Sequence, residues 1–162
     1  MHSCIYQISK MPLSPDEYAS PETYYENSDD FADYIGNSYK GDERAEHINI
    51  FAEIICGVFD YQGNDVFVYK GPSALYRFKK RWAEEIKTMA QKLNAADPLF
   101  YNSLYHIGCV TKKTHLFASS RVDIEGWTGG IACPLESLFI FAGSELKAGD
   151  RIYIGAVIDY HF

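Results

Sequence analysis

The stretch Pro72 to Asn94, PSALYRFKKRWAEEIKTMAQKLN, decides the fold. Apolar residues recur in it every three or four positions, and at 100° per residue they form one narrow stripe. Polar and charged residues occupy the opposite side. This pattern predicts one long helix with a buried face and a wet face. The stripe consists of Leu75, Phe78, Trp82, Ile86, Met89 and Leu93, and the wet face includes Arg77, Lys80, Glu84, Lys87 and Gln91.

Segments typical of strands lie on both sides of this helix in the sequence. They are rich in aromatic and β-branched residues, and short turns join four of them into two hairpins. The last is the clearest, because the even-numbered residues from Ile152 to Phe162 are all apolar or aromatic and are predicted to point to one face of the sheet. We therefore expect an α+β fold, an antiparallel sheet of about five to seven strands with one long helix (72–94) and shorter helices packed on one face. The predicted strands are 3–10, 58–62, 65–70, 105–110, 115–124 and 151–162.

Capping residues, prolines and glycines delimit the shorter helices. Ser and Asp are good N-caps, Pro is favoured in the first turn, and Gly often follows the last turn. Segments without a period and rich in Gly, Pro, Ser and Asp are typical of loops. The predicted helices are 28–35, 42–57, 98–104 and 134–143, and the predicted loops are 12–27 and 126–130.

Composition restricts the class of protein. The 162 residues suit a single globular domain, residues 1–162, and a net charge of −7 argues against a general nucleic-acid binder. Four cysteines without a C-x-x-C pair favour reduced thiols. With no apolar run of 18 residues and no signal peptide in the first 13, we expect a cytoplasmic protein with no membrane segment.

The negative charge is concentrated in the N-terminal third of the domain. Between Ser14 and Glu53, eleven Asp or Glu stand against two Lys or Arg, a net charge of −9, with tyrosines interleaved. Such a surface can attract a basic protein partner, or it can simply keep the protein soluble. The basic side of the long helix has three interpretations: solvation, a site for phosphate or an acidic partner, or pairing with this acidic segment inside the same fold.

One candidate active site lies on the predicted sheet. Asp159 and His161 are two apart on the last strand, so their side chains emerge on the same side. If that strand is next to the 115–124 strand, Ser119 and Arg121 converge with them. His161 would then act as base, Asp159 would orient it, Ser119 would be nucleophile or hydrogen-bond donor, and Arg121 would clamp an anion. The alternative is an ordinary solvated sheet face.

Three further residues are candidates for ligand binding: His106 beside that face, Tyr153 on the last strand, and Trp127 in a glycine-rich loop. Trp127 could act as a lid, although a tryptophan in such a loop more often seals the edge of a core. The spacing of His106, Cys109 and His115 matches no established zinc pattern, so we predict no metal and no cofactor. The sequence favours a binding or interaction module with an acidic, Tyr-rich N-terminal surface. The alternative is a small hydrolase- or transferase-like enzyme.

Overall fold

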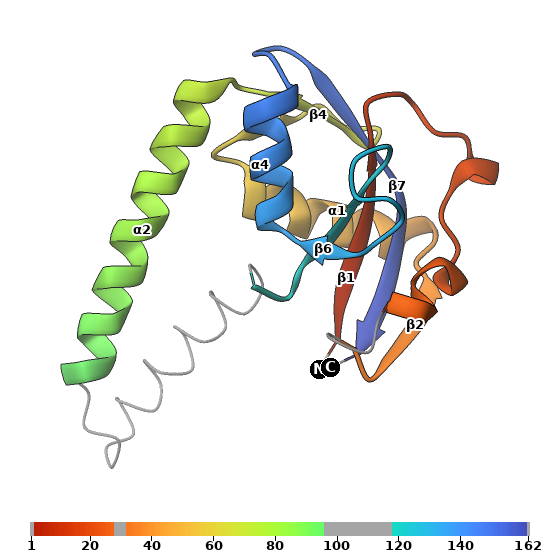
Figure 1. Cartoon of the computed structure of the whole chain (residues 1–162), viewed down its shortest axis with the longest axis horizontal. Coiled ribbons are helices and arrows are strands. Elements are labelled where there is room, and N and C mark those ends of the chain that lie inside the picture. Colours follow the sequence, from red (N-terminus) through yellow and green to blue (C-terminus); the bar gives the residue numbers. More distant parts are fainter. Residues whose placement is uncertain (1, 28–31, 96–117, 162) are drawn as a thin grey trace.

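The computed structural model describes residues 2–27, 32–95 and 118–161, and they form an α+β fold (Figure 1). Within these ranges a seven-stranded, mostly antiparallel sheet has the order β3-β4-β7-β1-β5-β6, and β2 also pairs with β7. The strands are β1 (His2–Ser9), β2 (Tyr34–Ser38), β3 (Phe59–Tyr61), β4 (Val66–Tyr69), β5 (Arg121–Ile124), β6 (Cys133–Pro134) and β7 (Arg151–His161). The helices are α1 (Gly41–Ile55), α2 (Pro72–Ala95) and α4 (Glu136–Glu145), and short 3-10 turns form η1 (Pro15–Glu17) and η2 (Pro21–Asn27).

Elements that depend on local sequence are confirmed. The long helix, the strand near the N-terminus, the hairpin across Gly63, the helix after Lys40 and the last strand all form where their patterns predict them. The loop at 126–130 is confirmed as a series of turns. The helix predicted from Pro134 begins at Glu136 and continues past Gly143 to Glu145, because Pro134 itself belongs to β6. The helix predicted at 98–104, the hairpin strand 105–110 and the first part of the strand 115–124 lie outside the described residues.

The helix predicted at 28–35 is wrong in its described part, because Tyr34–Ser38 is strand β2. The outer edge of β7 offers free backbone groups there, and the chain uses them. The Asp33 N–H donates to the His161 carbonyl at 2.7 Å, and the Tyr39 N–H donates to the Val157 carbonyl at 2.8 Å. Tertiary pairing thus overrides the local capping signal.

A β-bulge interrupts the last strand. Tyr6 of β1 lies opposite Val157, whereas Ile8 lies opposite Ile154, so β7 contains one more residue than β1 between these two pairs. An extra residue turns the following side chains to the other face of the sheet. Ile152 and Ile154 therefore share a core with Val157, and the prediction that all even-numbered residues point one way is wrong beyond Gly155.

The sheet is covered on both faces, so the protein has two cores. The larger core lies between the sheet and α1, α4 and the first turns of α2. The smaller one, which we call the second core, lies between the sheet and the N-terminal segment that contains η1 and η2. Its largest buried members are Ile5, Ile158, Tyr24 and Tyr160. The expected one-sided sheet, with an open polar face, is therefore wrong.

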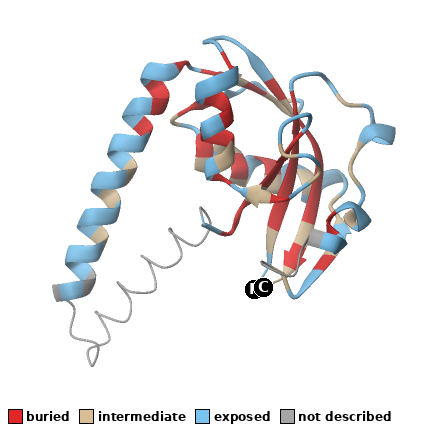
Figure 2. Ribbon diagram, in the orientation of Figure 1, coloured by how far each residue is buried: buried red, intermediate tan, exposed pale blue. Residues whose placement is uncertain are grey.

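Only the beginning of α2 is embedded in the larger core. Leu75 and Phe78 are each 7% exposed, but Ile86 is 39% exposed, and Trp82 is half-buried. Figure 2 shows the same change along the helix, which is buried where it meets α4 and mostly exposed farther out. The expectation that the whole apolar stripe is buried is thus confirmed for its first two turns only.

Two polar side chains hold the bulge together. Gln7 accepts hydrogen bonds from the N–H groups of Ala156 (3.0 Å) and Ala19 (2.8 Å), and it donates to the Glu17 carbonyl (3.1 Å). Arg44 of α1 donates to the carbonyls of Ile154 and Gly155, and it also pairs with Asp65 at 2.7 Å. These bonds replace the ladder bonds that the bulge interrupts, and Gln7 also fixes the N-terminal segment to the sheet.

Candidate functional site: the N-terminal cleft

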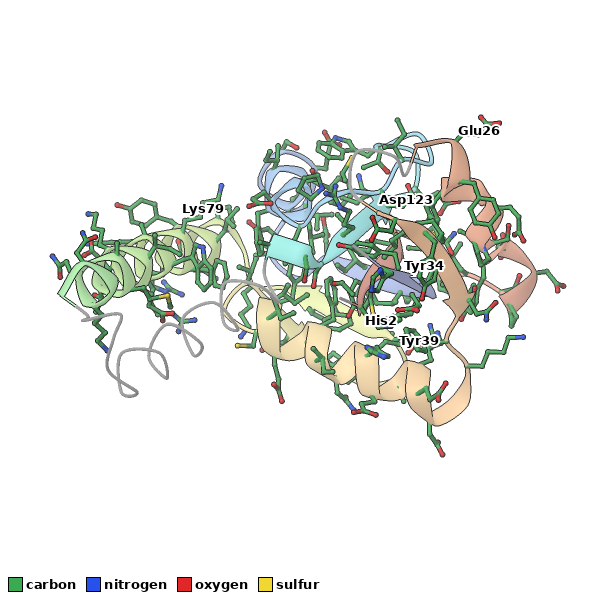
Figure 3. The ribbon with its side chains drawn as sticks, turned by 90° about the horizontal axis from the view of Figure 1, so that it is seen from below. His2, Glu26, Tyr34, Tyr39, Lys79 and Asp123 are labelled. Carbon is green, nitrogen blue, oxygen red and sulfur yellow. The ribbon has the colours of Figure 1, made fainter. Side chains whose placement is uncertain are left out.

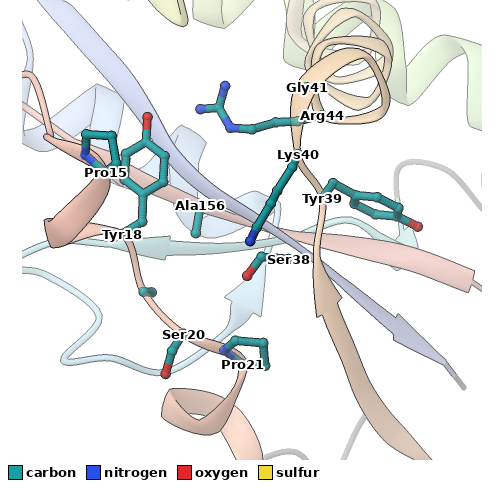
Figure 4. A pocket seen from close by; sticks show the side chains of 11 residues that line it. Pro15, Tyr18, Ser20, Pro21, Ser38, Tyr39, Lys40, Gly41, Arg44 and Ala156 are labelled. Atoms are coloured by element: carbon teal, nitrogen blue, oxygen red, sulfur yellow. The ribbon is translucent and has the colours of Figure 1, made fainter.

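A cleft of about 490 Å³ opens beside the bulge (Figure 4). One wall is the segment around η1 and η2, and the other is the junction between β2 and α1. This volume lies within the range of natural ligand pockets, roughly 300–1,000 Å³. We call it the N-terminal cleft, and it is lined by Pro15, Tyr18, Ala19, Ser20, Pro21, Ser38, Tyr39, Lys40, Gly41, Arg44 and Ala156.

The walls of the cleft are largely apolar. Two prolines, two alanines and the ring of Tyr18 contribute apolar surface to it. The ring of Tyr39 turns away from the cleft (Figure 4) and stacks on His47, with 4.1 Å between the ring centroids. Arg44 lies over the Tyr18 ring at 5.4 Å. Because its guanidinium already bonds to Asp65 and to two backbone carbonyls, its charge is largely used within the fold.

The surroundings of the cleft are acidic. Residues 15–22 and 38–46 contain six Asp or Glu and two Lys or Arg. Hydrogen bonds from Ser14 lower the pKa of Glu17, and a hydrogen bond from the Ser20 side chain lowers the pKa of Glu22. Both carboxylates therefore stay ionised at neutral pH. A ligand that enters this cleft meets a largely apolar lining that also holds Lys40 and Arg44, on two segments whose net charge is negative.

The predicted catalytic pair, Asp159 and His161, lies at the end of β7 where β1, β2 and β7 meet. The β3–β4 hairpin pairs with the other end of β7. Asp159 does not use His161 as its imidazole partner, but lies 3.0 Å from Nδ1 of His2 and accepts a 3.1 Å hydrogen bond from the Tyr39 hydroxyl. His161 lies 3.4 Å from Asp33 and stacks on Tyr34. His2, Tyr34 and Tyr39 are seen together in Figure 3.

The other two predicted catalytic residues face the second core. β1 lies between β7 and β5, so the condition for the predicted active site, that the last strand lies next to the 115–124 strand, is not met. Arg121 lies opposite Ile5 and donates to the Ala132 carbonyl at 3.3 Å. Ser119 is buried, accepts a 3.0 Å hydrogen bond from Ser3, and its carbonyl accepts one from the Tyr160 hydroxyl. The sheet separates these two residues from Asp159.

The three residues predicted to bind ligand are not gathered at one place either. His106 lies outside the described residues. Trp127 is 40% exposed, and its ring meets the edge of Phe141 at 5.8 Å, as a residue that seals a core edge does. Tyr153 pairs with Val66 near the start of β7, eight residues from His161, which corresponds to roughly 26 Å along a strand.

The structure also brings together a pair that no sequence pattern indicated, Cys4 of β1 and His47 of α1. The Cys4 sulfur lies 3.3 Å from Nδ1 of His47, beside a cavity of about 100 Å³ that Tyr6 and Tyr39 also line. Burial raises the pKa of the Cys4 thiol to about 12. The thiol is therefore protonated at neutral pH, and the pair lacks the thiolate that nucleophilic catalysis needs.

Asp123 is a second residue that sequence reasoning did not single out as a site. It is 7% exposed, and it accepts hydrogen bonds from the Tyr24 hydroxyl at 2.8 Å and from the Thr128 hydroxyl at 2.5 Å. These bonds join η2 and the glycine loop to the sheet. Asp123 therefore anchors the wall segment of the N-terminal cleft from the far side of the second core.

No cluster of three or more His, Cys, Asp or Glu side chains within the described ranges could hold a metal ion. Across the same ranges, no helix has both the length and the apolar character that crossing a bilayer requires.

Comparison with known proteins finds no matching family model, no similar curated protein and no similar solved structure. The geometry of the N-terminal cleft is therefore the main guide to what this chain does.

Proposed function

We propose that this protein is a binding module whose N-terminal cleft receives a basic segment of a partner protein. The observation that supports this most is the combination of a cleft of about 490 Å³ with an excess of carboxylates on the two segments that line it. Apolar walls give contact area, and carboxylates around them select positive charge and exclude negative charge. This is the acidic, Tyr-rich N-terminal surface that the sequence suggests, narrowed to a particular site.

The construction of the cleft also supports binding. Its floor is the bulge of β7, which Gln7 and Arg44 hold from both sides. Its outer wall is tied to the sheet through Tyr24 and Asp123. A cleft on rigid supports loses little entropy when a ligand enters, so modest contacts can yield useful affinity.

The enzyme alternative has weaker support. Its four candidate residues, His161, Asp159, Ser119 and Arg121, lie on two faces of the sheet, so no single substrate can touch all of them. The nearby Cys4 thiol has a pKa of about 12, so it is not an activated nucleophile. We therefore place recognition, and not catalysis, at the centre of the proposal.

The test is a titration of the ¹⁵N-labelled protein with two synthetic peptides, KKYKK and EEYEE, followed by NMR. We expect KKYKK to shift the amides of Ala19, Ser38 and Gly41, with an affinity that weakens as salt is added. EEYEE should leave these amides unchanged. Equal binding of both peptides, or shifts confined to another surface, would contradict the proposal.

A matched pair of variants separates the cleft from general charge effects. Asp16→Lys with Glu22→Lys reverses two carboxylates that flank the cleft lining, and we expect KKYKK to bind at least about tenfold more weakly, about 1.4 kcal/mol. Glu125→Lys with Glu136→Lys makes the same change in net charge at exposed positions elsewhere. That control should change the affinity less than about twofold, since unpaired charges at a distance are screened by salt.

A further inference from the structure

α2 carries an unusual excess of positive charge for this acidic chain. Between Pro72 and Ala95 there are six Lys or Arg and two Glu, and all six basic side chains are exposed. Two of them have intrahelical partners, in the pairs Arg81–Glu85 (3.8 Å) and Lys87–Glu84 (3.3 Å). Within the described ranges the other four have no carboxylate within 4.0 Å: Arg77, Lys79, Lys80 and Lys92.

This basic surface and the acidic surface are at opposite ends of the molecule. α2 projects from one side of the sheet, while η1, η2 and β2 lie on the other (Figure 1). Figure 3 shows the same separation, with Lys79 at one end and Glu26 at the other. The interpretation that the acidic segment neutralises α2 within the same fold is therefore wrong for η1, η2 and β2, whereas α1, which carries the rest of that segment, shares the larger core with the first turns of α2. The molecule is electrically bipolar.

We propose that the basic face of α2 docks on the N-terminal cleft of a second copy of this chain. This inference rests on the proposed function and names a partner for it. The two surfaces are complementary in charge, and an exposed helix is a common form of docking element. From Arg77 to Lys87 the basic residues extend over roughly 15 Å of helix, a length compatible with the rim of a cleft.

A second copy fits better than a nucleic acid. Duplex DNA would approach a molecule of net charge −7 that offers basic residues on a single helix. A second copy instead presents a cleft whose two lining segments, residues 15–22 and 38–46, carry six carboxylates against two basic residues. Because the two surfaces differ and lie at opposite ends, the contact is head-to-tail, and it leads to open chains of molecules unless the rotation closes a ring.

The test uses sedimentation velocity with charge-swapped variants at about 20 mM and about 300 mM salt, a change that shortens the screening length severalfold. The first variant, Arg77→Glu with Lys80→Glu, makes the α2 face acidic. The second, Asp16→Lys with Glu22→Lys, makes the rim basic. We expect the parent protein to associate at low salt and dissociate at high salt, and each variant alone to be monomeric. An equimolar mixture of the two variants should associate again, because both contacts are restored with reversed signs.

Each other outcome contradicts the inference. A parent protein that stays monomeric at low salt, or a mixture that stays monomeric while the parent associates, removes the second copy as the partner. A control with Lys147→Glu and Arg151→Glu changes the net charge equally at exposed positions outside α2, and it should associate as the parent does. If a 20-base-pair DNA duplex binds the parent through α2 and prevents its association, the basic face of α2 binds phosphates and not a second copy.

Failure of this inference can be told apart from failure of the proposed function. If KKYKK binds the cleft and the parent remains monomeric, the cleft recognises a basic segment of another protein. If the parent associates and the α2 variant associates equally, the contact uses a different surface. If neither peptide nor second copy engages the cleft, both proposals fall.

Discussion

Gln7 shows how one polar side chain decides the arrangement of a whole face of the sheet. Its amide makes three hydrogen bonds, one of them to the buried N–H of Ala156 at the bulge. A Cβ atom at Gly155 would come within 2.5 Å of the Gln7 side-chain oxygen, so the neighbouring glycine leaves room for it. The sequence predicts a strand on each side of this contact but not the contact itself, because the residues are 149 positions apart.

Replacing Gln7 by Leu should destabilise the protein by about 2–4 kcal/mol, because the Ala156 N–H stays buried without an acceptor and two further bonds are lost. Urea denaturation gives the free energy of unfolding directly. The matched control is Gln62→Leu, an identical change at an exposed position of the hairpin turn, and it should lie within about 0.5 kcal/mol of the parent. Equal losses in both variants would mean that the loss reflects the glutamine-to-leucine change itself and not the bulge.

At the scale of elements, the sequence pattern of α2 determines the bounds of the helix but not how far along its length the helix is buried. Period and capping give the limits of the helix correctly, because both depend on residues within one or two turns. The pattern also identifies the apolar side. It does not say what covers that side. The fully buried part of the stripe ends at Leu75 and Phe78, and Trp82 packs half-buried against the larger core.

This difference along one stripe predicts a matched pair of measurements. Leu75→Ala removes a side chain that is 7% exposed in the larger core and should cost about 2–4 kcal/mol. Ile86→Ala, three turns farther along the same stripe and 39% exposed, should cost less than about 1 kcal/mol. Both values come from the same urea titrations. Comparable losses at the two sites would show that α2 is covered along its whole length.

At the scale of the whole molecule, the order of the strands in the sheet could not be predicted from local sequence patterns. β1 lies in the middle of the sheet, antiparallel to β7 and parallel to β5, so the two ends of the described chain pair with each other. Nothing in a period of two identifies a partner 150 residues away. The predicted active site required β7 to lie beside β5. Because β1 lies between them, Asp159 and His161 are on one face of the sheet and Ser119 and Arg121 are on the other. The acidic third was predictable as a charged surface, but its cleft arises from the distant bulge.

Both cores contain buried phenols or thiols, which makes alkaline pH a test of the whole fold. Burial raises the pKa of Cys4 to about 12 from an ordinary 9.0, and it raises the pKa values of five tyrosines above 10.0. The folded chain therefore holds these protons more tightly than the unfolded chain. Their contribution to stability is complete below pH 9 and is lost as the pH rises toward the folded values. The five tyrosines are Tyr6, Tyr24, Tyr39, Tyr69 and Tyr160.

We therefore expect the urea midpoint to be level from pH 7 to about 9 and then to fall steeply up to pH 11. Each buried phenol contributes a slope of up to about 1.4 kcal/mol per pH unit above 10. Tyr24→Phe should flatten that decline, although it lowers stability at pH 7 by about 1.5–3 kcal/mol through the lost bond to Asp123. Tyr76→Phe changes a ring that is 70% exposed, so it should follow the parent at every pH. If the urea midpoint of the parent stays level up to pH 11, water reaches the tyrosine hydroxyls in the folded protein. The N-terminal segment would then not close the second core.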